Sequence, residues 1–103
     1  MLTYIGEYKE FNPSYTEFPS IKDSFCEAQY PGQDRIIAYL KNGGKEDMTS
    51  MSIQRDVITG DPIFSADTGR NDGVYTWWTS LAYYVEKYNL RLPEDFERHV
   101  LTK

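Results

Sequence analysis

A chain of 103 residues is long enough to build one hydrophobic core and too short for two, so we predict a single domain over residues 1–103. Hydrophobic residues make up 40% and charged residues 26% of the chain, which excludes the composition of a disordered protein. The net charge is -5, and lysine and arginine form no cluster. These features argue against nucleic acid as a partner and suit a basic protein partner.

The first part of the chain predicts a helical hairpin after an extended start. Residues 3–11 fit a short strand and an extended arm equally well. A capping box that begins at Ser20, followed by one stripe of apolar residues, predicts a helix over residues 20–28. A second helix is predicted to begin at residues 32–34 and to end at Asn42, before two glycines.

The middle of the chain predicts a small sheet, because the apolar period changes from about 3.6 to about 2 after the glycine pair. Residues 48–55 alternate and lead into a β-branched stretch, residues 63–66 form a second short apolar run, and residues 74–78 form a third. Asp72-Gly73 is a hairpin-turn signal before the third run. Three antiparallel strands are the simplest interpretation.

The end of the chain predicts two helices. Leu81, Tyr84, Val85 and Tyr88 form one apolar stripe, and Asn89 follows them. Pro93 then begins another helix, whose core face carries Phe96, Val100 and Leu101. The whole chain therefore predicts an α+β fold with an N-terminal helical hairpin, a small antiparallel sheet of about three strands, and a C-terminal helix pair packed on the sheet.

One longer segment of the sequence carries a recognisable combination of motifs. Residues 71–96 contain a turn with Asp-Gly, a Tyr-x-Trp strand, a Leu-Ala-Tyr-Tyr-Val-Glu-Lys-Tyr helix and a Leu-Pro-Glu-x-Phe helix start. This pattern resembles the closing segment of a family of small uncharacterised bacterial cytosolic proteins, and residues 36–43 and 55–62 are similar to the same family. The resemblance implies a fold and no activity. Trp78 departs from the family pattern, which has a smaller or charged residue or proline there.

The aromatic strand at residues 74–78 is the strongest candidate for a binding surface. In an extended strand Tyr75 and Trp77 point to one face and Trp78 to the other. One face is expected to meet the helices, which leaves at least one large ring near solvent. We therefore take Asp72, Tyr75, Trp77 and Trp78 as candidate partner-binding residues, with burial of both faces in the core as the alternative.

Catalytic and metal chemistry find little support. Cys26 and His99 are the only thiol and imidazole, and nothing nearby in sequence places them together or supplies a third residue to orient the base. Asp67, Asn71 and Asp72 share a loop but lack the calcium-loop spacing. Nucleotide-binding glycine motifs are also absent from the sequence, so we predict no catalytic residue, no metal and no cofactor.

The sequence thus favours a non-enzymatic protein-interaction module, and one specific form is an immunity-type inhibitor of a basic toxin. The single cysteine excludes an intrachain disulfide, and neither a signal-peptide pattern nor a membrane-length apolar run occurs. We therefore predict a cytoplasmic location without membrane contact. Two alternatives remain: a small enzyme or ligand-binding domain that uses carboxylates assembled by the fold, and a homodimer formed through the sheet.

Overall fold

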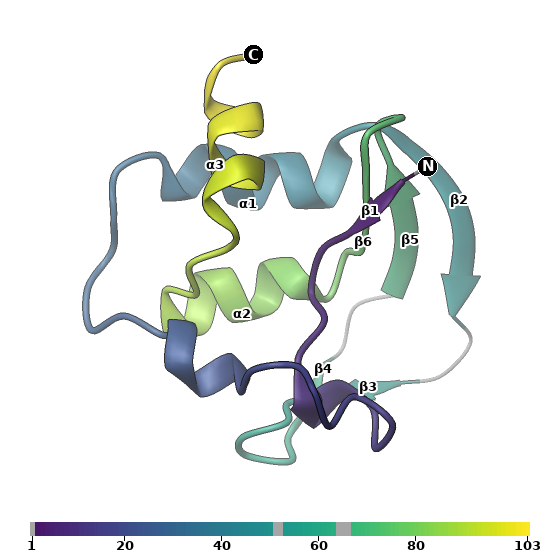
Figure 1. Cartoon of the computed structure of the whole chain (residues 1–103), viewed down its shortest axis with the longest axis vertical. Coiled ribbons are helices and arrows are strands. Elements are labelled where there is room, and N and C mark those ends of the chain that lie inside the picture. Colours follow the sequence, from purple (N-terminus) through teal and green to yellow (C-terminus); the bar gives the residue numbers. More distant parts are fainter. Residues whose placement is uncertain (1, 51–52, 64–66) are drawn as a thin grey trace.

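The computed structural model describes residues 2–50, 53–63 and 67–103, and confirms the α+β class within these residues. In chain order the elements are β1 (Thr3–Tyr4), the 3-10 turns η1 (Lys9–Phe11) and η2 (Ile21–Ser24), α1 (Gln33–Asn42), β2 (Lys45–Ser50), β3 (Gln54–Arg55), β4 (Pro62–Ile63), β5 (Asp67–Asn71), β6 (Tyr75–Trp78), α2 (Leu81–Tyr88) and α3 (Glu94–Leu101). Figure 1 shows the larger sheet on one side of the molecule and the three helices on the other.

The larger sheet is mixed and has four strands in the order β1-β6-β5-β2, where the sequence predicted about three antiparallel strands. Two of its strands, β1 and β5, were not among the three predicted, and β1 pairs in parallel with β6. Backbone bonds from the Thr3 N–H to the Val74 carbonyl (2.9 Å) and from the Ile5 N–H to the Thr76 carbonyl (2.8 Å) hold it there. Strands β3 and β4 form a separate antiparallel pair. The N-terminal segment is therefore a sheet edge and not a loose arm.

The core lies between the larger sheet and the helices. Trp77 is completely buried, and its ring packs against Tyr39 of α1 and Phe96 of α3 at centroid distances of 5.5 and 5.7 Å. Its indole N–H donates to the Leu40 carbonyl at 2.8 Å, so the polar tip of the ring is satisfied inside the core. Helix α1 packs against both α2 and α3.

The two predicted C-terminal helices are confirmed. Leu81, Tyr84 and Val85 of α2 are buried, as are Phe96 and Val100 of α3. Asn89 ends α2 in the left-handed conformation with φ 53°, which asparagine tolerates better than most residues. Among the residues that the structure describes, no helix combines the length and the apolar character needed to cross a bilayer.

The first arm of the predicted helical hairpin is much shorter than expected. Ser20 does cap the start, accepting the Lys22 N–H at 3.2 Å, but only the four residues of η2 are helical. The backbone beyond them bonds to the end of α2 instead: the Cys26 N–H donates to the Tyr88 carbonyl, and the Arg91 N–H donates to the Ser24 carbonyl. Tertiary hydrogen bonds thus replace the helical ones that the local pattern predicts.

Residues 67–71 form strand β5 at the interior of the sheet, although their composition predicts a loop. Gly69 makes this possible, because a Cβ atom there would lie 2.9 Å from the Met48 side chain on β2. Of the predicted 63–66 strand, Ile63 belongs to β4 and the rest lies outside the described residues. The calcium-loop interpretation of residues 67–72 is thereby removed, since most of them are in a strand.

Candidate functional site

A pocket lies where the start of α2 meets the face of the larger sheet that points away from Trp77, which we call the open face. Strand register defines this face: Gly69 is opposite both Met48 and Trp78, and Asp67 is two residues from Gly69 along β5. Side chains two apart share a face, so Asp67, Met48 and Trp78 all point to the open side. The parallel pairing of Tyr4 with Thr76 adds Tyr4 to the same face.

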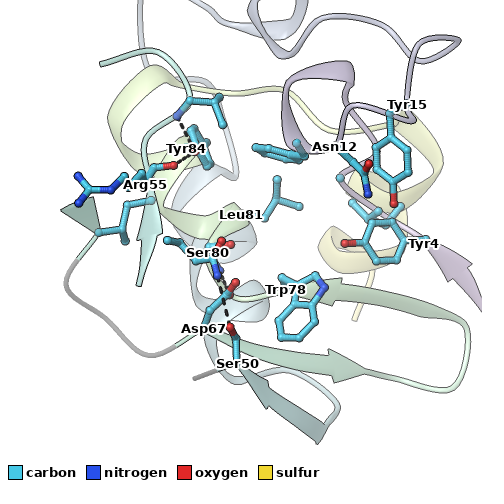
Figure 2. Close-up of a pocket in the computed structure, with 16 residues that line it drawn as sticks. Tyr4, Asn12, Tyr15, Ser50, Arg55, Asp67, Trp78, Ser80, Leu81 and Tyr84 are labelled. Carbon is cyan, nitrogen blue, oxygen red and sulfur yellow. Dashed lines mark hydrogen bonds between the residues drawn. The ribbon is translucent and has the colours of Figure 1, made fainter. Parts of the chain in front are cut away.

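The pocket has a volume of about 310 Å³ and an aromatic lining. Five rings contribute to it: Tyr4, Phe11, Tyr15, Trp78 and Tyr84. Figure 2 shows Trp78 lying between Asp67 on one side and the pair of Tyr4 and Tyr15 on the other. A few polar groups among many apolar ones are typical of a binding pocket, and this volume is at the small end of the usual range.

Asp67 is the buried charge of the pocket. Its residue surface is only 5% exposed. Both of its side-chain hydrogen bonds use Oδ1, which accepts the Ser80 N–H at 2.9 Å and the Thr79 hydroxyl at 3.5 Å. Among the described residues none donates to Oδ2. The carboxylate is therefore fixed in place by one oxygen while the other keeps its hydrogen-bonding capacity.

Tyr4 is a neutral phenol at physiological pH. Burial raises its pKa to about 12, with further contributions from the nearby Tyr15, Asp67 and Glu7. Because a phenolate beside a carboxylate would suffer like-charge repulsion, the phenol keeps its proton. The pocket thus presents one carboxylate and neutral aromatic walls.

The candidate residues of the aromatic strand divide between core and surface. Tyr75 and Trp77 share the helix-facing side, as the alternation predicts, and Tyr75 packs against Phe96 and His99 at 5.1 and 4.9 Å. Trp77 has no exposed surface, so the core interpretation holds for it. Trp78 points to the opposite face, is partly exposed, and lines the pocket. Trp78 is thus the partly exposed ring on the side opposite Trp77, and its role in partner binding stays a prediction.

Asp72 is the centre of a structural cluster. Its Oδ1 accepts the Val74 and Tyr75 N–H groups at 2.9 and 2.7 Å, and its Oδ2 accepts the Tyr39 hydroxyl and contacts His99 Nε2 at 2.7 Å. Burial opposes ionisation, but these donors outweigh it and hold the pKa of Asp72 well below its usual range. Asp72 ties the β5–β6 turn to α1 and α3, and both of its oxygens are engaged.

Cys26 and His99 do not form a dyad. Cys26 is exposed beside the end of α2, where the Asn89 side chain contacts its carbonyl. His99 belongs to the Asp72 cluster on α3. Within the described residues, no set of three histidine, cysteine or carboxylate side chains is arranged to hold a metal ion.

Sequence reasoning missed two buried carboxylates. Asp56 Oδ2 accepts the hydroxyls of Tyr83 and Tyr88 at 2.7 and 2.6 Å, and Lys87 Nζ lies 3.5 Å away. Glu97 pairs with the Arg91 guanidinium through both oxygens, at 2.6 and 3.0 Å. The spacing of four residues between Tyr83 and Lys87 places both side chains on one side of α2, but this local pattern does not identify Asp56 as their acceptor.

No protein-family model, no curated protein and no solved structure matches this chain. The similarity of residues 71–96 to a family of small bacterial proteins therefore stays a prediction.

Proposed function

We propose that this protein is a non-enzymatic interaction module that binds a basic protein partner on the open face of its larger sheet. Its most specific form is a cytoplasmic, immunity-type inhibitor that covers a basic toxin. The observation that carries the proposal is the division of the tryptophans, since Trp77 is sealed in the core while Trp78 is partly exposed and lines the pocket on the open face.

Exposed apolar side chains accompany Trp78 on that face. Leu2 precedes β1 and Val74 precedes β6, and the register of these strands carries both side chains to the open side. Leu2 is 40% exposed, Val74 49% and Met48 58%. A group of exposed apolar residues around a large ring is typical of a protein-binding surface.

Charge supports a basic partner. The chain carries 16 acidic and 11 basic residues, and the buried Asp67 opens onto the same face. Opposite potentials accelerate association and disfavour wrong partners. The exposed thiol of Cys26 suits a reducing compartment, since free surface cysteines oxidise readily elsewhere.

An enzyme built from assembled carboxylates has less support. Asp56, Asp72 and Glu97 lie in separate clusters, and each is satisfied by hydrogen bonds from its own neighbours. Such saturated groups stabilise the fold and have little capacity left to move protons.

Affinity capture with a matched pair of variants tests the proposal. The tagged protein, Trp78→Ala and Ile58→Ala are each incubated with an extract of the cells that make the protein. Ile58 supplies the control because it is an exposed apolar residue outside the larger sheet. We expect the wild type and Ile58→Ala to retain the same stoichiometric basic protein, and Trp78→Ala to bind it at least about 30-fold more weakly, the loss typical of a hot spot.

Two results would overturn the proposal. One is equal retention of the partner by Trp78→Ala and the wild type. The other is a stable homodimer in light scattering that Trp78→Ala dissociates, because the open face would then be occupied by a second copy of the chain.

A further inference from the structure

We infer that the pocket beside Trp78 receives a lysine side chain of the partner, with the ammonium group bound to Asp67. The inference rests on the proposed function and names the chemistry of its central contact. The pocket offers a wall of aromatic rings and the Oδ2 oxygen of Asp67, to which none of the described residues donates, and these two features together select a cation.

The strongest argument is the pairing of buried carboxylates with basic groups. Asp56 has Lys87 at 3.5 Å, Glu97 has Arg91 at 2.6 Å, and Asp72 has His99 at 2.7 Å. Asp67 is shielded to a similar degree, yet among the described residues no ion pair reaches it. The two hydrogen bonds of Asp67 both go to Oδ1, so Oδ2 can accept from a group that enters the pocket. A cation supplied from outside would reproduce the ion pairs seen at Asp56 and Glu97.

A basic residue of the chain itself, Arg55, lines the pocket but forms no ion pair with Asp67. The Arg55 guanidinium donates to the Gly60 carbonyl at 3.1 Å. Figure 2 shows this side chain directed away from Trp78 and Asp67, so Arg55 borders the pocket mainly with its backbone. The backbone carbonyl of Arg55 is itself occupied by the Tyr84 hydroxyl at 3.2 Å.

The geometry of Asp67 favours lysine over arginine. A guanidinium binds best when both carboxylate oxygens accept in parallel, as Arg91 and Glu97 do within this protein. Glu97 does so while one of its oxygens also accepts the Leu92 N–H, whereas Asp67 Oδ1 already accepts two other donors, the Ser80 N–H and the Thr79 hydroxyl, so a second bond to a guanidinium would crowd it further. A compact ammonium needs no fork-shaped acceptor and can donate to one oxygen while its other protons meet neighbouring groups.

The remaining walls suit the rest of a lysine side chain. Trp78 and Tyr4 line the pocket, and cations bind favourably over the faces of such rings. The Tyr4 phenol stays protonated up to about pH 12 and can accept a hydrogen bond from the ammonium. Leu81 and Ile63 provide apolar contact for the four-carbon stem.

Nuclear magnetic resonance of the two indole N–H groups provides a direct test. The probe is N-acetyl-lysine methylamide, and the comparison probes are its ε-acetylated form and the arginine analogue. Trp77 is an internal reference because its indole N–H is hydrogen-bonded in the core, and a Trp78→Phe variant assigns the second signal. We expect the lysine probe to shift the Trp78 signal and leave the Trp77 signal in place, with an affinity in about the millimolar range for so small a ligand.

A matched pair of aspartate variants isolates the carboxylate. Asp67→Asn keeps an oxygen for the Ser80 N–H and replaces the unpaired oxygen with an amide, while Asp61→Asn removes the same charge from an exposed turn. We expect Asp67→Asn to weaken lysine binding at least about tenfold and Asp61→Asn to change it by less than about twofold.

The inference is wrong if the ε-acetylated probe binds as well as the lysine probe, if the arginine analogue binds more tightly, or if Asp67→Asn binds lysine like the wild type. It is also wrong if a free diamine saturates the wild-type pocket at micromolar concentration, because the site would then serve a small molecule. These results leave the Trp78-dependent capture of a partner intact, so the lysine pocket and the proposed function can fail separately.

Discussion

Replacing Asp56 with alanine is the sharpest test of how the fold is held together. The carboxylate has no exposed surface and accepts the hydroxyls of Tyr83 and Tyr88 on α2, with Lys87 beside them. Its other oxygen accepts two backbone N–H groups of the turn that follows it, at 2.7 and 3.1 Å. Asp56 thus fastens the β3–β4 hairpin to α2, and alanine would leave five donors without their acceptor: two hydroxyls, two backbone N–H groups and the Lys87 ammonium.

The expected cost follows from these contacts. A donor left unsatisfied in a buried site costs about 1 to 3 kcal/mol, so the five donors together set an upper limit well above the loss expected from removing one contact. The hydroxyls of Tyr83 and Tyr88 are partly exposed and can regain water, which places the expected loss at about 3 to 4 kcal/mol. Asp61→Ala, in the exposed turn of the same hairpin, should change the free energy of unfolding by less than about 0.5 kcal/mol.

Urea denaturation at several pH values measures the effect. Burial opposes ionisation of Asp56, but hydrogen bonds from Tyr88 and Tyr83 and from the backbone outweigh it and hold its pKa well below the usual value of 3.8. A depressed pKa in the folded state contributes stability above the unfolded-state pKa, and this contribution is lost as the pH falls below about 4. The difference between the wild type and Asp56→Ala should therefore shrink on acidification. A loss under about 1 kcal/mol at neutral pH would refute the reasoning.

Three further predictions concern other parts of the fold. Trp77→Phe should cost about 2 to 3 kcal/mol in urea denaturation, because it leaves a cavity and a helix carbonyl without its donor, whereas Trp78→Phe on the open face should cost less than about 1 kcal/mol. Gly44→Ala should cost more than about 3 kcal/mol, since the φ of Gly44 is +64° and the new Cβ would lie 2.1 Å from a strand carbonyl oxygen. Gly60→Ala should cost only about 1 to 2 kcal/mol, because Gly60 has φ +79° but open space around the new Cβ. Thermal melts of the two variants measure the difference. Burial raises the pKa of Tyr8 to about 12, so the contribution of the neutral Tyr8 phenol to stability is complete below about pH 10 and is lost as the pH rises toward 12. Ultraviolet titration of Tyr8→Phe should show one late-ionising phenol fewer than the wild type. A normal phenol titration at this residue would contradict the prediction.

Local sequence patterns predict the C-terminal half well because the forces there are local. The apolar stripe of α2 repeats with the helical period, and Asn89 ends the helix through its own conformational preference. The alternation along β6 likewise predicts which of Tyr75, Trp77 and Trp78 face the helices, since a strand has a fixed period of two. A short window contains all the information that these features need.

Two segments depart from their local patterns because distant residues supply their partners. The capping signal at Ser20 is real, yet the chain leaves the helix at Phe25, whose ring stacks on Tyr88 at 4.5 Å. Residues 67–71 have the composition of a turn, but β2 and β6 pair with them on both sides, and Gly69 lets Met48 pack closely. In both segments tertiary contacts outweigh local propensity, and no window of sequence contains those contacts.

The candidate site likewise contains one residue that the sequence pattern predicts and one that it does not. Trp78 could be predicted as the exposed ring, because strand alternation places it opposite Trp77. Asp67 could not, because its importance depends on its burial and on which basic residues lie elsewhere. Lys87 meets Asp56 because α2 packs against the β3–β4 hairpin, and Arg91 meets Glu97 because the chain turns just before α3, so the carboxylate without a basic partner among the described residues is defined only by the tertiary structure. Among the described residues Asp67 has no basic partner, and its Oδ2 receives no donor, which makes Asp67, rather than any sequence motif, the residue on which partner recognition is expected to depend.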